Sequence, residues 1–151
     1  SIRRIAYQIL ADNSDRERII IAGVMSNGNK VAKSISKVLR SISNIEVTNC
    51  QININKKNPR NNIETSINVS ECEEQSLVIV DDVLHTGSTL IYAVRHFLQF
   101  SLAQCKVAVL INRNHKKFPI KADYKGISLS TSMLEHVEIV CKNDTFKGYL
   151  A

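Results

Sequence analysis

Three short runs of consecutive apolar residues restrict the folds open to this chain. Residues 19–22, 77–80 and 107–111 each have the length of a β-strand and contain no polar side chain. Strands that are apolar on both faces are typical of parallel sheets covered by helices. Between the first two runs, apolar residues recur at helical spacing over residues 31–39. This alternation predicts an α/β fold with a central, mainly parallel sheet flanked by helices.

The pattern also predicts where the elements lie. We expect helices over residues 4–13, after residue 28 and over 88–100, and strands over 18–25, 45–54, 77–81, 107–111, 127–129 and 137–140. Segments 55–62 and 116–126 are predicted to be irregular. Ligands of parallel sheets bind beyond the carboxyl ends of the strands, which is where loops 26–28 and 81–88 are expected.

Size and composition fit one domain over residues 1–151, able to bury a core without a disulfide or metal. The four cysteines have no paired-ligand spacing, which is typical of reduced thiols in the cytoplasm. No apolar run approaches the roughly 20 residues of a membrane span, and the N-terminus has no signal-like stretch, so we expect a cytoplasmic protein without membrane contact. The net charge of +6 favours anionic partners, either a phosphorylated small molecule or a nucleic acid.

Two adjacent carboxylates, Asp81 and Asp82, directly follow the apolar run 77–80. Neighbouring carboxylates repel each other and need cations or hydrogen-bond donors nearby. The vicinal hydroxyls of a ribose offer two donors to such acceptor groups. The pair therefore predicts a sugar-binding position at the end of this strand.

A loop of small residues comes shortly afterwards, at the expected start of a helix: Thr86, Gly87, Ser88 and Thr89. Unpaired backbone N–H groups and the helix dipole favour an anion there. Together with the acidic pair, the loop predicts a site for ribose 5-phosphate. The alternative is an exposed turn in which Thr86 or Ser88 caps the helix.

Segment 78–90 reads Val-Ile-Val-Asp-Asp-Val-Leu-His-Thr-Gly-Ser-Thr-Leu. As a whole it resembles the signature of the type I phosphoribosyltransferases. Residues 112–126 read Asn-Arg-Asn-His-Lys-Lys-Phe-Pro-Ile-Lys-Ala-Asp-Tyr-Lys-Gly. They resemble a run typical of the pyrimidine operon regulators in that family. Those regulators combine uracil phosphoribosyltransferase activity with RNA attenuation. The resemblance continues through residues 130–132 and 137–139 and is weakest over 55–76.

The resemblance implies the type I phosphoribosyltransferase fold with a small hood, to which residues 118–126 contribute. It implies transfer of 5-phosphoribose from 5-phosphoribosyl 1-diphosphate (PRPP) to a nucleobase, uracil, with release of diphosphate. Asp81 and Asp82 would hold the ribose hydroxyls and stabilise positive charge, and Arg113 would reach towards diphosphate and base. Magnesium would be the cofactor, carried by PRPP rather than by protein side chains. A homo-oligomer is implied by analogy.

The resemblance also assigns two further loops. Ser26, Asn27 and Gly28 stand in the diphosphate loop, and Lys56 and Lys57 in a mobile loop that closes over the site. The regulators have Lys-Thr-Arg-Gly where this chain has Met-Ser-Asn-Gly, so two cationic side chains are replaced. The alternative for residues 26–28 is a plain turn capped by Ser26 or Asn27. The alternative for the loop with Lys56 and Lys57 is a solvated loop that has no function.

Three functions are compatible with these observations. The first is a phosphoribosyltransferase, and the second is a non-catalytic protein that binds PRPP or a nucleotide. The third is an RNA-binding regulator, for which basic residues near two predicted helices would supply charge: Arg3, Arg4, Lys33 and Lys37. Tyr7 replaces a histidine of the regulators, and His85 and His115 are expected to be solvent-facing loop residues rather than general bases.

Overall fold

The computed structural model describes residues 1–130, 137–143 and 145–150, so Thr131 and Ser132, to which the resemblance extends, lie outside the described residues. The elements in chain order are α1 (Ile2–Asp12), β1 (Arg18–Val24), α2 (Asn27–Ile42), β2 (Glu46–Asn53), β3 (Glu64–Thr65), the 3-10 helix η1 (Val69–Cys72), β4 (Ser76–Leu84), α3 (Ser88–Phe97), β5 (Gln104–Arg113), β6 (Tyr124–Leu129), β7 (Val137–Lys142) and β8 (Thr145–Leu150).

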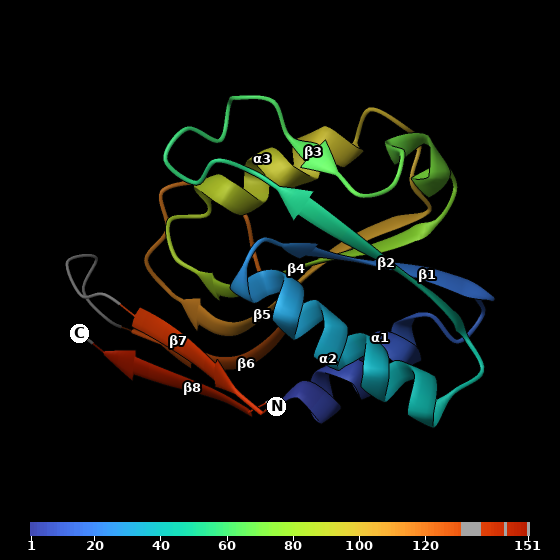
Figure 1. Cartoon of the computed structure of the whole chain (residues 1–151), viewed down its shortest axis with the longest axis horizontal. Helices are drawn as coiled ribbons and strands as arrows, with labels where there is room; N and C mark the ends of the chain where they lie inside the picture. Colours follow the sequence, from blue (N-terminus) through green and yellow to red (C-terminus); the bar gives the residue numbers. More distant parts are fainter. Residues whose placement is uncertain (131–136, 144, 151) are drawn as a thin grey trace.

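A six-stranded sheet in the order β3-β2-β1-β4-β5-β6 forms the centre of the fold (Figure 1). β2, β1, β4, β5 and β6 pair in parallel, and the short β3 pairs antiparallel with β2 at one edge. A separate two-stranded sheet is formed by β7 and β8. The predicted α/β fold with a mainly parallel central sheet is therefore confirmed.

Helices cover both faces of the large sheet, with α1 and α2 on one side and α3 on the other (Figure 1). Alternate residues of β1 enter the two layers: Ile19 and Ile21 pack in the core beneath α1 and α2, whereas Ile20 and Ala22 pack in the core beneath α3. All four side chains are fully buried. A strand buried on both faces has no polar alternation, which is why the run is continuous.

Several boundaries differ from the prediction. β4 continues to Leu84 because its backbone pairs with β5 as far as Asn112, beyond the point where the apolar run stops. β6 begins at Tyr124, inside the segment predicted to be irregular, because it too pairs with β5. α3 ends at Phe97, earlier than predicted, and β3, η1 and β8 were not predicted. Backbone pairing with a neighbouring strand leaves little trace in the side-chain pattern.

The first turn of α2 lies directly against the end of β4. A Cβ atom at Gly28 would stand 2.8 Å from the Val80 carbonyl oxygen and 2.9 Å from both the Cα and Oδ1 of Asp81. Only glycine allows such a close backbone approach. Gly28 thus determines how near Asn27 comes to the acidic end of β4.

We expect Gly28→Ala to lower the free energy of unfolding by roughly 1–3 kcal/mol, because the added methyl group overlaps backbone atoms in a packed region. Ser34→Ala, a change at a half-buried position later in α2, is the control and should have little effect. Urea unfolding followed by circular dichroism measures both. Equal stability of the two variants would contradict the close approach.

Candidate functional site

A cleft of about 470 Å³ opens beside the carboxyl ends of β4 and β5. This is the edge at which ligands of parallel sheets bind. Its lining comes from the starts of α2 and α3, the loop after β2, the ends of β4 and β5, and β7: Asn27, Lys56, Asp81, Asp82, Val83, Leu84, His85, Thr86, Gly87, Ser88, Thr89, Leu90, Arg113, Val137, Glu138 and Ile139.

Most residues predicted for the site line this one cleft. The acidic pair, the small-residue loop and Arg113 meet there, together with Asn27 and Lys56. The remaining predicted residues do not line it. Ser26 and Lys57 are exposed, and Gly28 is buried beneath the cleft against β4.

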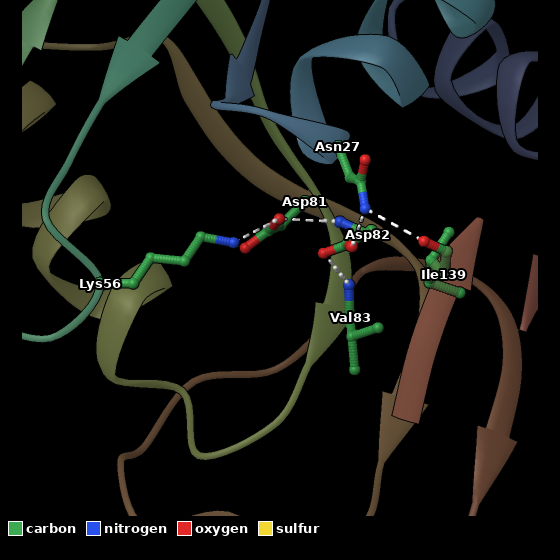
Figure 2. A network of polar contacts seen from close by, with 6 residues as sticks. All are labelled: Asn27, Lys56, Asp81, Asp82, Val83 and Ile139. Atoms are coloured by element: carbon green, nitrogen blue, oxygen red, sulfur yellow. Dashed lines mark hydrogen bonds and ion pairs between the residues drawn. The ribbon is translucent and has the colours of Figure 1, made fainter. Parts of the chain in front are cut away.

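Asp81 is almost completely buried, with 2% of its surface exposed. Its Oδ1 accepts a hydrogen bond of 2.8 Å from the backbone N–H of Asp82 and lies 3.5 Å from Nζ of Lys56 (Figure 2). Burial raises the pKa of Asp81 to about 8; Lys56 acts in the opposite direction and the neighbouring Asp82 adds to the increase. The ion pair with Lys56 does not outweigh burial, because the lysine side chain is 46% exposed and solvent screens its charge.

Asp82 lies on the other side of β4, because successive strand residues point to opposite faces. It is half-buried, and its Oδ1 accepts a 2.8 Å hydrogen bond from the backbone N–H of Val83. Its Oδ2 accepts a 3.2 Å hydrogen bond from Nδ2 of Asn27, which also donates to the carbonyl oxygen of Ile139 at 3.2 Å (Figure 2). Neither Asn27 nor Ser26 caps α2 with its side chain, so the capped-turn alternative is wrong.

The loop between β4 and α3 is held in place by the following segment of chain. The Thr86 carbonyl accepts hydrogen bonds from the backbone N–H groups of Lys117 and Phe118, at 2.9 and 3.0 Å. Gly87 has a φ of +89°, and a side chain at this position would overlap Ile120. Thr86 Oγ1 accepts a 3.2 Å hydrogen bond from the Ser88 N–H and so closes the turn, but the N-cap of α3 is Gly87, and neither Thr86 nor Ser88 caps the helix. The loop still leaves the start of α3, where orphan N–H groups attract anions, at the cleft.

Arg113 is the last residue of β5 and is 1% exposed. The asparagines on either side tie this strand end to the neighbouring chain: Asn112 Nδ2 donates to Ser128 Oγ at 3.3 Å, and Asn114 Nδ2 donates to Ser130 Oγ at 2.7 Å. They link the ends of β5 and β6 around Arg113.

The two histidines of the loops differ. His115 is exposed, as predicted, whereas His85 is half-buried and lines the cleft. The prediction of a solvent-facing His85 is therefore wrong, because the continued pairing of β4 with β5 carries the following loop inward.

Sequence reasoning missed the wall that β7 gives to the cleft, formed by Val137, Glu138 and Ile139. Their alternating pattern predicted a strand, but no local signal places that strand across the end of β4. Among the described residues, segment 118–126 supplies no lining residue; Phe118 and Ile120 brace the loop after β4 instead.

Comparison with known proteins agrees with this geometry. The family described as "Phosphoribosyl transferase domain" matches residues 1–142. The chain belongs to this family. It is 32% identical to the bifunctional protein PyrR of Streptococcus thermophilus over 145 residues, which cover 93% of this chain and 83% of that protein. PyrR of Streptococcus agalactiae is 28% identical over 140 residues, covering 91% and 81%.

Solved phosphoribosyltransferases share the fold. A hypoxanthine-guanine phosphoribosyltransferase of Bacillus anthracis superposes with a TM-score of 0.71 at 19% identity, over 85% of this chain and 74% of that one. The hypoxanthine phosphoribosyltransferase of Trypanosoma cruzi gives 0.74 at 20%, over 85% and 74%. At these identities the likeness concerns the fold, and it confirms the type I phosphoribosyltransferase architecture.

Within residues 1–130, 137–143 and 145–150, no helix is long and apolar enough to cross a membrane. The same residues contain no group of three or more His, Cys, Asp or Glu side chains placed to hold a metal ion.

We expect the free energy of unfolding to fall as pH rises from about 5 to 9. The pKa of Asp81 is about 8 in the folded protein, against an ordinary value of 3.8. The folded state therefore keeps a proton that the unfolded state has lost, and this stabilisation disappears as pH passes through the folded pKa. The asparagine of Asp81→Asn resembles the protonated carboxyl group and does not titrate. The fall in the free energy of unfolding between pH 5 and 9 should therefore be smaller in this variant, by on the order of a few kcal/mol.

Urea unfolding across this pH range measures the effect. Lys56→Met removes the cation beside Asp81, and Lys57→Met, at the adjacent exposed lysine, is the matched control.

Nζ of Lys56 favours the ionised carboxylate, so its removal raises the folded-state pKa of Asp81 further. The fall in stability therefore extends to higher pH in Lys56→Met, whereas Lys57→Met should match the wild-type protein. A wild-type profile that Asp81→Asn leaves unchanged would contradict the assignment of this titration to Asp81.

Proposed function

We propose that this chain transfers 5-phosphoribose from PRPP to uracil and releases diphosphate. The observation that carries the proposal is the meeting of the acidic pair, the loop 86–89 and Arg113 in one cleft. Membership of the phosphoribosyltransferase family supports the reaction type. Uracil is the base implied by the resemblance to the pyrimidine operon regulators.

In this proposal the two ends of the phosphoribose have separate partners. Asp81 and Asp82 accept hydrogen bonds from the ribose hydroxyls, and the backbone N–H groups at the start of α3 receive the 5-phosphate. Thr86, Ser88 and Thr89 add hydroxyl groups to that end of the cleft. Arg113 and the β7 wall remain for the diphosphate and the base.

The reaction breaks the bond between the ribose C1 and the diphosphate oxygen, whose electron pair leaves with diphosphate. A uracil nitrogen bonds to C1 and loses its proton to the departing diphosphate or to water. Positive charge develops on the sugar between these events, and the carboxylates of Asp81 and Asp82 stabilise it electrostatically. A nearby positive charge also favours the ionised form of Asp81, opposing the effect of burial on its pKa.

Magnesium fits this site as an ion carried largely by the substrate. Mg²⁺ is usually held by one or two carboxylates together with phosphate oxygens and water. Asp82 and Asp81 supply carboxylate oxygens, and the described residues hold no larger group of metal ligands. When bound, the ion would neutralise charge on the diphosphate.

A non-catalytic binding protein is the second candidate, and the diphosphate loop favours it. Asn27 is neutral where the regulators have arginine, and its amide is engaged by Asp82 and Ile139. Lys56 and Arg113 are the cationic side chains lining the described part of the cleft. Such a protein would bind ribose 5-phosphate or a nucleotide without turnover.

A diphosphate-release assay separates these two candidates. With PRPP, magnesium and a panel of uracil, cytosine, hypoxanthine and guanine, we expect release that depends on uracil. Asp82→Asn should lower kcat/KM by about 100-fold or more, because a charge that stabilises the transition state is lost. Asp15→Asn, at an exposed position, is the control. Calorimetric binding of ribose 5-phosphate without release from any base would support the binding protein and overturn the enzyme.

RNA binding is a third candidate, favoured by a basic hollow of about 340 Å³ beside α2, lined by Lys30, Lys33, Ser34, Lys37, Cys141 and Asn143. The arginines of α1 have contacts within the chain instead. Arg3 stacks over the Tyr7 ring at 5.5 Å, and Arg4 donates to the carbonyl oxygens of Lys125 and Gly126, both at 2.7 Å.

Removing two of the α2 lysines tests this surface. We expect Lys30→Ala with Lys33→Ala to weaken binding of a structured RNA and to reduce the salt slope by about one to two, since each lysine–phosphate contact contributes roughly 0.7 to 0.9. Lys57→Ala with Lys106→Ala is the charge-matched control. Filter binding over a range of salt concentrations measures the slope, and equal slopes for both double variants would exclude this surface.

A single domain over residues 1–151, a homo-oligomer and a cytoplasmic location stay predictions from the sequence. Size-exclusion chromatography with light scattering tests the oligomer.

A further inference from the structure

The side-chain amide of Asn27 joins two sides of the cleft. Its Nδ2 carries two hydrogens and lies 3.2 Å from Oδ2 of Asp82 on β4 and 3.2 Å from the carbonyl oxygen of Ile139 on β7 (Figure 2). One half-buried side chain thus contacts both the acidic pair and the β7–β8 hairpin.

The packing of Gly28 and of the β7–β8 hairpin positions Asn27 between β4 and β7. Gly28 brings the first turn of α2 against Val80 and Asp81, so the preceding side chain reaches the end of β4. The hairpin is seated by apolar contacts, because Val137 and Ile139 belong to the same core as residues of α2. Apolar contacts are not directional, whereas a hydrogen bond fixes the position of the Ile139 carbonyl relative to Asp82.

We propose that Asn27 is a positioning residue that couples the sugar side of the cleft to its β7 wall. Its amide orients Asp82 Oδ2 and holds β7 across from it, so that one ligand engages both sides together. This inference rests on the proposed function, in which the sugar lies at the acidic pair and the base lies at the β7 wall.

The coupling has a measurable consequence for binding. In the proposed site, ribose 5-phosphate would contact the sugar and phosphate side alone, whereas uridine 5′-monophosphate would also reach the β7 wall. Loss of the Asn27 amide should therefore weaken the nucleotide more than the sugar phosphate. A hydrogen bond to a charged group has a strength that corresponds to about a tenfold change in affinity.

Isothermal titration calorimetry with both ligands tests the coupling. For Asn27→Ala we expect the affinity ratio of nucleotide to sugar phosphate to fall about tenfold. Asn27→Asp, which has the same shape, should be worse than Asn27→Ala at pH 8, because it places a carboxylate beside Asp82 and the Ile139 carbonyl. Its defect relative to wild type should shrink as the pH is lowered to 4, because the neighbouring Asp82 favours protonation of the introduced carboxyl, which can then donate one hydrogen bond. A merely structural role would give no such pH dependence.

An equal loss of affinity for both ligands would overturn the coupling and leave the proposed function intact. Failure of the wild-type protein to bind either ligand would overturn both. Hydrogen exchange separates the contact between Asn27 and β7 from ligand binding: Asn27→Ala should speed exchange of the β7 amides, whereas Ser41→Ala, at an exposed position near the end of α2, should not. Unchanged exchange at β7 would show that Asn27 does not hold the hairpin, and thermal unfolding identifies a variant that fails to fold.

Discussion

The parallel ladder between β4 and β5 is the constraint on which the rest of the site depends. Val83 pairs with Ile111 and Leu84 with Asn112, so the two strands end side by side. This pairing brings the acidic pair of β4 to the same edge of the sheet as Arg113 of β5. Both strands are buried on both faces, and their positions are fixed by packing rather than by the polar groups at their ends.

The two carboxylates at that edge of the sheet differ in burial and in their neighbours. Asp81 is buried in surroundings that disfavour its charge, and its contact with the half-exposed Lys56 does not offset this effect. Asp82 is more exposed and is oriented by the neutral amide of Asn27. The two carboxylates are neighbours in sequence but differ in burial and in hydrogen-bond partners. A divalent cation bound with the substrate would favour the charged form of Asp81.

The sequence was sufficient for the parts of the fold that side chains determine. The apolar runs at 19–22, 77–80 and 107–111 predicted the central strands, and segment 78–90 predicted the strand, loop and helix start that line the cleft. It was insufficient where backbone pairing decides. β4 and β6 are longer than their apolar runs because both pair with β5. The place of β7, and with it the second contact of Asn27, depends on how distant segments pack, for which no local pattern exists.

A crystal structure of the protein with ribose 5-phosphate is the most direct test that this cleft holds a phosphoribosyl group. The ribose hydroxyls should lie within hydrogen-bond distance of the Asp81 and Asp82 carboxylates, with the phosphate at residues 86–89. A phosphate bound instead in the basic hollow beside α2, with the cleft unchanged, would contradict the assignment.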